Sequence, residues 1–394
     1  MNIEELRRRF FRGLSRRLFR VTDARLRRSE DLPPLKIRRI LVCRPNHRLG
    51  NLLLLTPLLV ELQRVLPNAT VDIVLAGDCG AELFRTFTNV RHIYALSRRM
   101  VRHPITIVRT LMRIRRAGYD LAIDPCEASQ SGRFLLAAAN ATYLLGVPRQ
   151  ADANPADPLS ARLAPTHMAQ WPVFMLRRAL LHQPSAPDND YPTLAVQLSL
   201  DERRRGRRVL DGLLRGQNES FDRIVVGVFA EATGAKRYHQ DWWGCFIAAL
   251  RLQRTCTIVE IAPPDGRSRL SSGLPVFSSP SPREVAAVIA NMRCFVSADC
   301  GVMHLASASG TPTIGLFSVS DMAKYKPYGP HDHAIDTRGK PPEAVAWLAS
   351  EFVGTLILDG TAAPSQSPVG QFAHAAGSDS DREQGDFMLP AAGG

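Results

Sequence analysis

The segment VSADCGVMHLASASGTPTIGLF, residues 296–317, contains a strand, a tight turn, a helix and a second strand in immediate succession. Its first apolar run ends near Ser297 and predicts a buried strand, and Gly301 opens a helix that ends at Gly310. Pro312 separates this helix from the next apolar run. A strand, a crossover helix and a second strand so close together predict a βαβ unit in a parallel sheet. The segment therefore places the chain in the α/β class.

The same alternation extends in both directions from this segment. Strand-like and helix-like runs alternate from residue 37 to about 185 and again from about 221, with a linker rich in Pro and polar residues at 186–200. Each series predicts a doubly wound, Rossmann-like sheet, and two such sheets leave a cleft between them. We therefore expect a basic amphipathic helix at 1–36, an N-terminal domain at 37–185, a linker and helix at 186–220, a C-terminal domain at 221–360 and a disordered tail at 361–394.

The first forty residues are strongly basic. They carry 13 Lys or Arg against 5 Asp or Glu, which is +8 of the net charge of +13. The apolar residues between the arginines recur on one side of a helix, namely Leu6, Phe10, Leu14, Leu18 and Val21. Such a helix over residues 1–30 binds an anionic membrane surface, or else packs its apolar stripe on the body of the protein. Nucleic acid is a disfavoured partner, because no nucleic-acid-binding module follows the basic segment.

The rest of the composition excludes several classes of protein. No apolar run reaches the roughly 18 to 20 residues of a membrane span, and no secretory signal follows the basic start. The 7 cysteines are scattered without a CxxC pair, which argues against a zinc site and a disulfide framework and favours a reducing cytoplasm. Neither first strand is followed by GxGxxG, so a dinucleotide-dependent dehydrogenase is disfavoured.

The turn at residues 299–304 has the chemistry of an anion site. We expect Asp299 to cap the helix, with the backbone N–H groups of the first turn pointing outward beside Gly301, where no Cβ blocks a phosphate. His304 lies about one turn further along, on the same side as Cys300. The alternative is an ordinary strand–turn–helix corner.

The loop FAEATGAKRYHQDWW, residues 229–243, follows the first strand of the second half. Thr233 and Gly234 predict a turn, which leaves Lys236 at the carboxyl end of that strand and beside the 299–304 turn. A lysine at that place neutralises a diphosphate, whereas the alternative is a solvated loop charge.

The loop RPNHRLGNLLLLTP, residues 44–57, is the matching corner of the first half. A strand leads into it, and a helix is expected over residues 51–66. Asn51 follows the glycine, and its amide has no useful basicity, so it cannot act as a general base. The titratable alternatives are His47 in the same loop, and Asp124 and Glu127 at the end of the strand YDLAID, residues 119–124.

These segments together resemble glycosyltransferase family 9, the ADP-heptose:lipopolysaccharide heptosyltransferases. Four of them match in order: the strand–LG–helix–TP of 40–57 followed by LVELQRVLPNATVDIVLAG, then YDLAID, then the lysine loop followed by DWW, and finally ADCGVMHLASASGTPTIGLFSVSD leading into YKPYGP at 325–330. The resemblance covers roughly residues 37–350. It implies a GT-B fold, in which two Rossmann-like domains face each other across a cleft.

The resemblance also implies a reaction. The C-terminal domain would bind a nucleotide-sugar donor, commonly ADP-L-glycero-D-manno-heptose, and the N-terminal domain would bind a lipid-linked core oligosaccharide acceptor. Transfer would invert the anomeric centre with no metal and no cofactor. The protein would be cytoplasmic and peripheral on the inner face of the cytoplasmic membrane. A sugar-nucleotide epimerase on the same fold is the remaining enzymatic alternative.

The family's motifs assign roles to particular residues. The donor's diphosphate and sugar would be surrounded by Lys236, Asp299, Gly301 and His304, with Thr233, Cys300 and Val302 completing the donor set. Cys300 replaces the usual hydroxyl residue, and Asn51 replaces the family's Asp after the first-loop glycine. Three hypotheses follow for the acceptor side. Another residue is the base, first His47 and then Asp124 or Glu127; or Asn51 only positions the acceptor for slow transfer; or the protein binds a sugar nucleotide or glycan without catalysis.

Overall fold

The computed structural model describes residue 26 and residues 32–77, 80–96, 104–126, 129–146, 164–181, 190–215, 224–270 and 273–358. The basic helix expected at the N-terminus lies almost wholly outside these residues, as do Glu127 and the tail from 361. Leu26 is the exception, and it is buried in the core of the first lobe. None of the described helices has both the length and the apolar character that crossing a bilayer would require.

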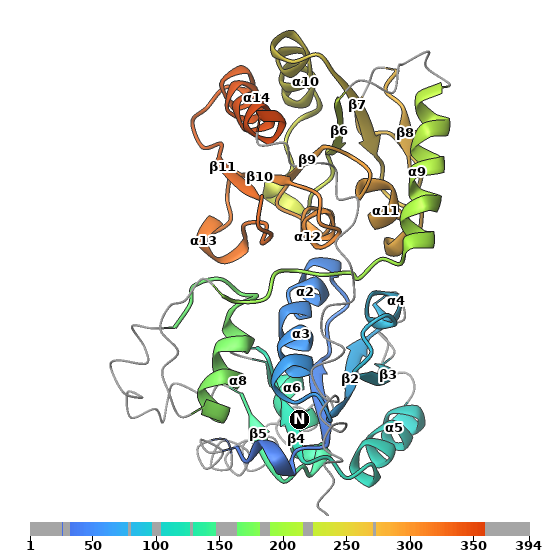
Figure 1. Ribbon diagram of the computed structural model, residues 1–394, viewed down its shortest axis with the longest axis vertical. Coiled ribbons are helices and arrows are strands. Elements are labelled where there is room, and N and C mark those ends of the chain that lie inside the picture. Colours follow the sequence, from blue (N-terminus) through green and yellow to red (C-terminus); the bar gives the residue numbers. More distant parts are fainter. Residues whose placement is uncertain are drawn as a thin grey trace, which may run out of the picture.

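The first lobe is built on a five-stranded parallel sheet in the order β3-β2-β1-β4-β5 (Figure 1). Its strands are β1 (Arg39–Arg44), β2 (Thr70–Ala76), β3 (Val90–Leu96), β4 (Leu121–Ile123) and β5 (Tyr143–Leu145). The sheet is covered on both faces, so β1 buries both Ile40 and Leu41 although they point to opposite sides. One face packs on α3 (Thr56–Val65) and α8 (Trp171–Leu181), and the other on α5 (Pro104–Arg116) and α6 (Gln130–Ala139).

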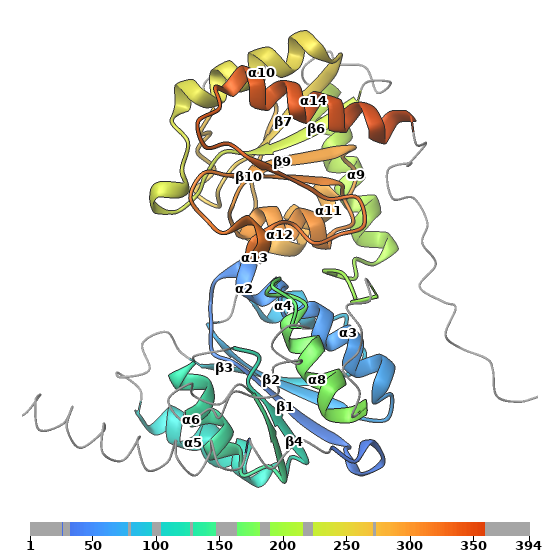
Figure 2. The same ribbon diagram turned by 90° about the vertical axis from the view of Figure 1, so that its left-hand side faces the viewer.

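The second lobe repeats this plan with a six-stranded parallel sheet in the order β11-β10-β9-β6-β7-β8. Its strands are β6 (Ile224–Phe229), β7 (Cys256–Ile261), β8 (Val276–Phe277), β9 (Cys294–Ala298), β10 (Thr313–Phe317) and β11 (His333–Asp336). Helices α10 (Gln240–Gln253) and α14 (Pro342–Leu358) cover its outer face, while α11 (Pro282–Ile289) and α12 (Gly301–Ala308) lie between the sheet and the first lobe (Figure 2). The expected pair of doubly wound parallel sheets is therefore confirmed.

The segment at residues 190–198 passes between the lobes without regular secondary structure. It bonds to both lobes, because Ala195 N donates to Thr56 Oγ1 at 3.1 Å and Val196 N donates to Ala308 O at 3.0 Å. Helix α9 (Leu200–Arg215) follows it and packs on α11. The chain therefore crosses from one lobe to the other through a well-bonded connection.

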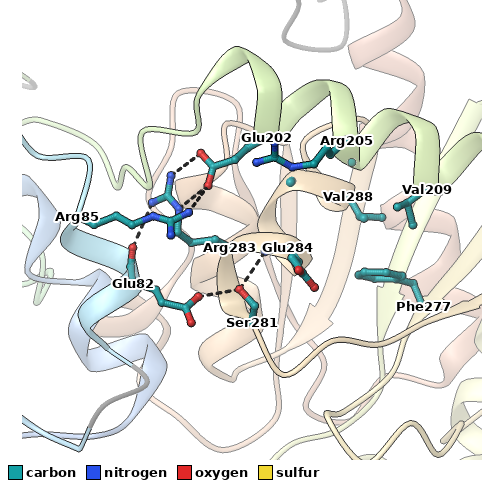
Figure 3. Close-up of a pocket in the computed structure, with 12 residues that line it drawn as sticks. Glu82, Arg85, Glu202, Arg205, Val209, Phe277, Ser281, Arg283, Glu284 and Val288 are labelled. Atoms are coloured by element: carbon teal, nitrogen blue, oxygen red, sulfur yellow. Dashed lines mark hydrogen bonds and ion pairs between the residues drawn. The ribbon is translucent and has the colours of Figure 1, made fainter.

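Arg283 of α11 fastens this connection from the second lobe (Figure 3). Its guanidinium donates twice to the Glu202 carboxylate, at 2.7 Å each, and to Val196 O at 3.0 Å. Arg85, from the first lobe, also reaches Glu202 at 2.9 Å, and Ser281 Oγ donates to Glu82 at 2.7 Å. Hydrogen bonding from Arg283 holds the pKa of Glu202 well below its usual range, although burial opposes this. A hollow of about 480 Å³ opens beside these groups and contains none of the predicted site residues.

The structure corrects one helix and adds several elements that the sequence did not predict. The helix expected over 51–66 is two helices, α2 (Leu49–Leu53) and α3, because Pro57 has no N–H to continue α2 and Thr56 Oγ1 instead donates to Leu53 O at 2.7 Å. The additions are α8, β8, β11, α13 (Met322–Tyr325) and α14. The side chains of α8 and α14 are apolar around most of each helix, so these two helices lack a clear amphipathic period.

Candidate functional site

The predicted site residues follow four particular strands. The strand order reverses between β1 and β4 in the first sheet and between β6 and β9 in the second. In open α/β sheets, ligands bind beyond the carboxyl ends of the strands at such reversals. The residues that follow these four strands are His47 and Asn51 after β1, Asp124 after β4, Thr233 and Lys236 after β6, and Asp299 to His304 after β9. Both lobes therefore direct their predicted residues to the position where this architecture places a ligand.

Lys236 and Asp299 form an ion pair beyond the carboxyl ends of β6 and β9, two central strands of the second sheet. The lysine ends a short 3-10 helix, η4 (Gly234–Lys236), and its Nζ lies 2.6 Å from Asp299 Oδ2. The predicted placement of Lys236 beside the 299–304 turn is thus confirmed. The predicted capping role of Asp299 is wrong, because Cys300 is the N-cap of α12 and makes no capping hydrogen bond with its side chain. The carboxylate of Asp299 holds the lysine instead.

The Cys300 thiol points back toward the strand that precedes it. Its Sγ lies 3.2 Å from Ser297 Oγ. Burial raises the pKa of the Cys300 thiol, although Ser297 and the amides of Met303 and Val302 act in the opposite direction. The thiol is therefore neutral at physiological pH and leaves the positive end of α12 without an anionic side-chain cap.

His304 is a buried, neutral imidazole. Burial lowers the pKa of His304 to about 4, even though the nearby Asp299 favours the charged form. Its Nδ1 has no hydrogen-bond partner among the described residues. A buried polar atom without a partner costs free energy unless a ligand or water satisfies it. His304 is thus prepared to form one further hydrogen bond at this site.

Two glycines let the lobes touch beside His304. A Cβ at Gly50 would lie 2.9 Å from the His304 ring, and a Cβ at Gly301 would lie 2.9 Å from Leu49 Cβ. The first turns of α2 and α12 therefore approach each other closely at this point. Each helix presents the partial positive charge of its N-terminus, and the Lys236 ammonium, which is paired with Asp299, lies nearby. The N-terminal N–H groups together with a lysine donor suit the oxygens of a diphosphate.

The acceptor-side residues lie in different surroundings. His47 is exposed in the loop that precedes α2, and Asn51 is half-buried in the first turn of that helix. Asp124 is 2% exposed, and its carboxylate accepts from Cys126 N at 3.1 Å. Gly132 of α6 makes room for Asp124, since a Cβ there would lie 2.2 Å from Oδ2. Asp124 is therefore packed against α6 and is not open to solvent.

Burial also changes the protonation of Asp124. It raises the pKa of Asp124 to about 7, while the Cys126 N–H and the Arg44 charge act in the opposite direction. The Arg44 guanidinium bonds to Cys126 Sγ, and its Nε donates to Asn51 O at 3.4 Å. Asp124, Cys126 and Arg44 thus form a chain of contacts that leads from the buried carboxyl to Asn51.

The sequence analysis did not single out residues 164–170, which contribute His167 to the surroundings of the site. His167 lies across the lobe boundary, with Nε2 2.9 Å from Lys326 O, while its Nδ1 accepts from Ala169 N at 3.2 Å. These two bonds fix the neutral tautomer with hydrogen on Nε2. The ring stacks on Tyr328 with centroids 4.7 Å apart, and a charge on His167 would lower the pKa of His304. Of the two segments in this contact, only YKPYGP was recognisable as a motif, because residues 164–170 contain none.

A hollow of about 360 Å³ adjoins the lysine loop. Glu231 forms its acidic wall and is paired with Arg237 and with Arg269, the latter at 2.8 Å. Tyr238 and Trp243 line the same hollow, and Trp243 Nε1 has no partner among the described residues. The hollow has both charged and aromatic walls, and none of the predicted site residues lines it.

Comparisons with known proteins identify the family and the fold. The sequence profile of glycosyltransferase family 9 (heptosyltransferase) matches residues 107–346. A family 9 glycosyltransferase from Veillonella parvula is similar in structure, with a TM-score of 0.64 and 14% identity over 84% of this chain and 100% of that chain. No curated protein matches the chain at the level of sequence.

Two structures from E. coli are also similar. ADP-heptose lps heptosyltransferase II has a TM-score of 0.60 and 16% identity over 82% of this chain and 100% of its own. Heptosyltransferase WaaC with ADP has a TM-score of 0.56 and 18% identity over 81% of this chain and 99% of its own. At these identities the likeness establishes the fold, which is that of the GT-B heptosyltransferases.

Proposed function

Since this chain belongs to glycosyltransferase family 9, whose profile matches more than half of it, we propose that it is an inverting transferase that moves a heptose or similar sugar from a nucleotide-sugar. The donor is of the ADP-heptose type, and the acceptor is a lipid-linked glycan such as a lipopolysaccharide core. The observation that carries the proposal is the pair of Lys236 and Asp299 beside the N-terminus of α12, where the two lobes meet.

On the donor side, the reaction needs help for the departing diphosphate. Asp299 holds Lys236 in place, and the lysine charge stabilises the negative charge that develops on the leaving group. The amides around Gly301 and Val302 supply hydrogen bonds and the positive end of the helix dipole. Neutral His304 lies beside these groups, and its Nδ1 is buried without a partner among the described residues.

On the acceptor side, we assign the general base to His47. It is exposed in the loop after β1, so an acceptor hydroxyl can reach it, and histidine is the side chain that most often serves as a general base. Asp124 is closed off and partly protonated near neutrality, so its part is to hold the Cys126 and Arg44 contacts below Asn51. Asn51 orients the hydroxyl through its amide oxygen. The lipid-linked acceptor places the protein at the inner face of the cytoplasmic membrane.

A second candidate function is binding of a sugar nucleotide or glycan without transfer. Asn51 favours it, because the amide cannot take the proton that the family's carboxylate would take. The donor side of the site would be unchanged, so nucleotide binding alone does not separate the two functions.

The test measures nucleoside diphosphate release from ADP-heptose with and without a core-type acceptor. Wild type should release ADP only with the acceptor, and His47→Ala should lower the rate by about 10² to 10⁴, the usual contribution of a general base. His92→Ala is the matched control, since His92 is an exposed histidine of β3 in the same lobe. If only Asn51→Asp is active, the natural protein is the binder. If wild type is active and His47→Ala is equally fast, His47 is not the base.

A further inference from the structure

Helix α5 of the first lobe exposes an apolar stripe. Ile105, Val108 and Met112 are 67%, 48% and 50% exposed, and their spacing puts them on one side of the helix. Packing on the lobe uses a different side, where Ile114 is fully buried and Leu111 is partly buried. The fold therefore does not need the exposed stripe for its own core.

Arginines flank this stripe on both sides. Arg109, Arg113, Arg115 and Arg116 are all exposed. Residues 104–116 contain no Asp or Glu, so α5 carries a charge of +4. In the part of the chain that the structure describes, none of these four arginines is in an ion pair. An apolar stripe between rows of unpaired arginines is the pattern of a helix that lies in a membrane interface.

We propose that this face of α5 docks on an anionic phospholipid surface. The apolar stripe would enter the boundary between headgroups and acyl chains, and the arginines would contact lipid phosphates. A second copy of α5 would bring +4 against +4. The segment at residues 1–31 is also disfavoured as the partner that covers the α5 stripe, because its 10 arginines against 5 Asp or Glu would be repelled by the α5 arginines. Charge complementarity therefore selects the anionic bilayer among these occupants.

The position of α5 fits this role. It lies on the outer side of the first lobe and away from the second lobe in both views (Figures 1 and 2). Docking through α5 would leave the lobe junction free and bring the first lobe to the lipid. The inference rests on the side chains of α5 alone, and it holds whatever sugar the protein transfers or binds.

The experiment is co-sedimentation of the full chain with vesicles of phosphatidylglycerol and phosphatidylcholine, or of phosphatidylcholine alone. Wild type should bind the anionic vesicles, and salt should weaken the binding. The variant Ile105→Ser/Val108→Ser/Met112→Ser should lower the partition coefficient about tenfold or more. Its matched control is Leu200→Ser/Leu252→Ser/Trp347→Ser, which removes three exposed apolar side chains of the second lobe and should bind as wild type does.

A second pair of variants tests the charges. Arg109→Glu/Arg116→Glu should weaken binding by about tenfold or more, because each cation near an anionic surface contributes about 1 kcal/mol. Arg204→Glu/Arg208→Glu on α9 is the control with the same change of charge. The proposal is overturned if wild type ignores anionic vesicles, if the α5 variants bind as wild type does, or if the control variants lose as much binding. It is also overturned if the serine variant changes only the oligomeric state, since the stripe would then be a contact between copies.

This measurement is independent of the proposed reaction. Vesicle binding uses no donor, and sugar transfer can be followed with an acceptor that has lost its lipid. Loss of vesicle binding with unchanged transfer to the soluble acceptor would support the docking face, whereas loss of transfer alone would count against the function. Melting curves of the variants should match wild type, because all the substituted side chains are exposed.

Discussion

Replacing Arg283 by methionine should destabilise the junction between the lobes strongly. Arg283 is 2% exposed and makes two 2.7 Å bonds to Glu202, whose side chain is 8% exposed. Methionine fills much of the volume but leaves the carboxylate buried with one charged partner, Arg85 at 2.9 Å. Breaking a buried pair typically costs about 3–5 kcal/mol, and we expect the lower half of that range because Arg85 remains.

Unfolding in urea, followed by circular dichroism, measures this loss. Arg85→Met is the matched control, because it removes the other arginine of the same cluster, which is 58% exposed and should contribute less than about 1 kcal/mol. The double variant Arg283→Met/Glu202→Gln should regain part of the loss, since no buried charge is left unpaired. The reasoning is refuted if Arg283→Met loses no more unfolding free energy than Arg85→Met does. It is also refuted if the double variant loses more unfolding free energy than its two single variants lose together.

Three further outcomes follow from the site. Asp124→Asn should be more stable than wild type at pH 8, by at most about 4 kcal/mol, because the buried carboxylate is costly above its pKa of about 7. Urea titrations should show this difference in unfolding free energy shrinking as the pH falls from about 7 to about 4. A difference that does not depend on pH would contradict this. Gly50→Ala should cost about 1–3 kcal/mol in thermal unfolding, because its Cβ would lie 2.9 Å from the His304 ring, whereas Gly212→Ala, with no atom within 4 Å, should be neutral or stabilising. NMR should find the His304 ring uncharged at pH 6 and titrating near pH 4, and an imidazolium at pH 6 would show that it is not buried.

Much of the fold could be predicted from the sequence, because its strands are short apolar runs between recognisable turns. The strands that carry the site, β1, β4, β6 and β9, all lie in such runs. The elements that escaped prediction have weak local signals. Helices α8 and α14 are apolar around most of their circumference, and β8 has only two residues. Their structure is decided by burial against distant parts of the chain.

Part of the candidate site could likewise be predicted from the sequence, and part of it could not. Lys236 was expected beside the 299–304 turn because both follow strands of the second half, and the carboxyl ends of parallel strands lie along the same edge of a sheet. The capping role given to Asp299 was wrong, because Cys300 occupies the N-cap position of α12 and the Asp299 carboxylate bonds to Lys236 instead. The contact of Gly50 with Gly301 and the place of His167 depend on how the lobes meet. Nothing in the local sequence specifies that geometry.

The central claim is that Lys236 and the first turn of α12 bind the diphosphate of a nucleotide-sugar. Calorimetric titration with ADP, UDP and GDP in the presence of a chelator tests it most directly, with Lys236→Met and the exposed-lysine control Lys340→Met. We predict that wild type and Lys340→Met bind one of these nucleotides alike. Lys236→Met should bind it about 10- to 100-fold more weakly, the value of a charge-assisted hydrogen bond. Binding that is unaffected by Lys236→Met, or no binding of any of the three by wild type, would contradict the account.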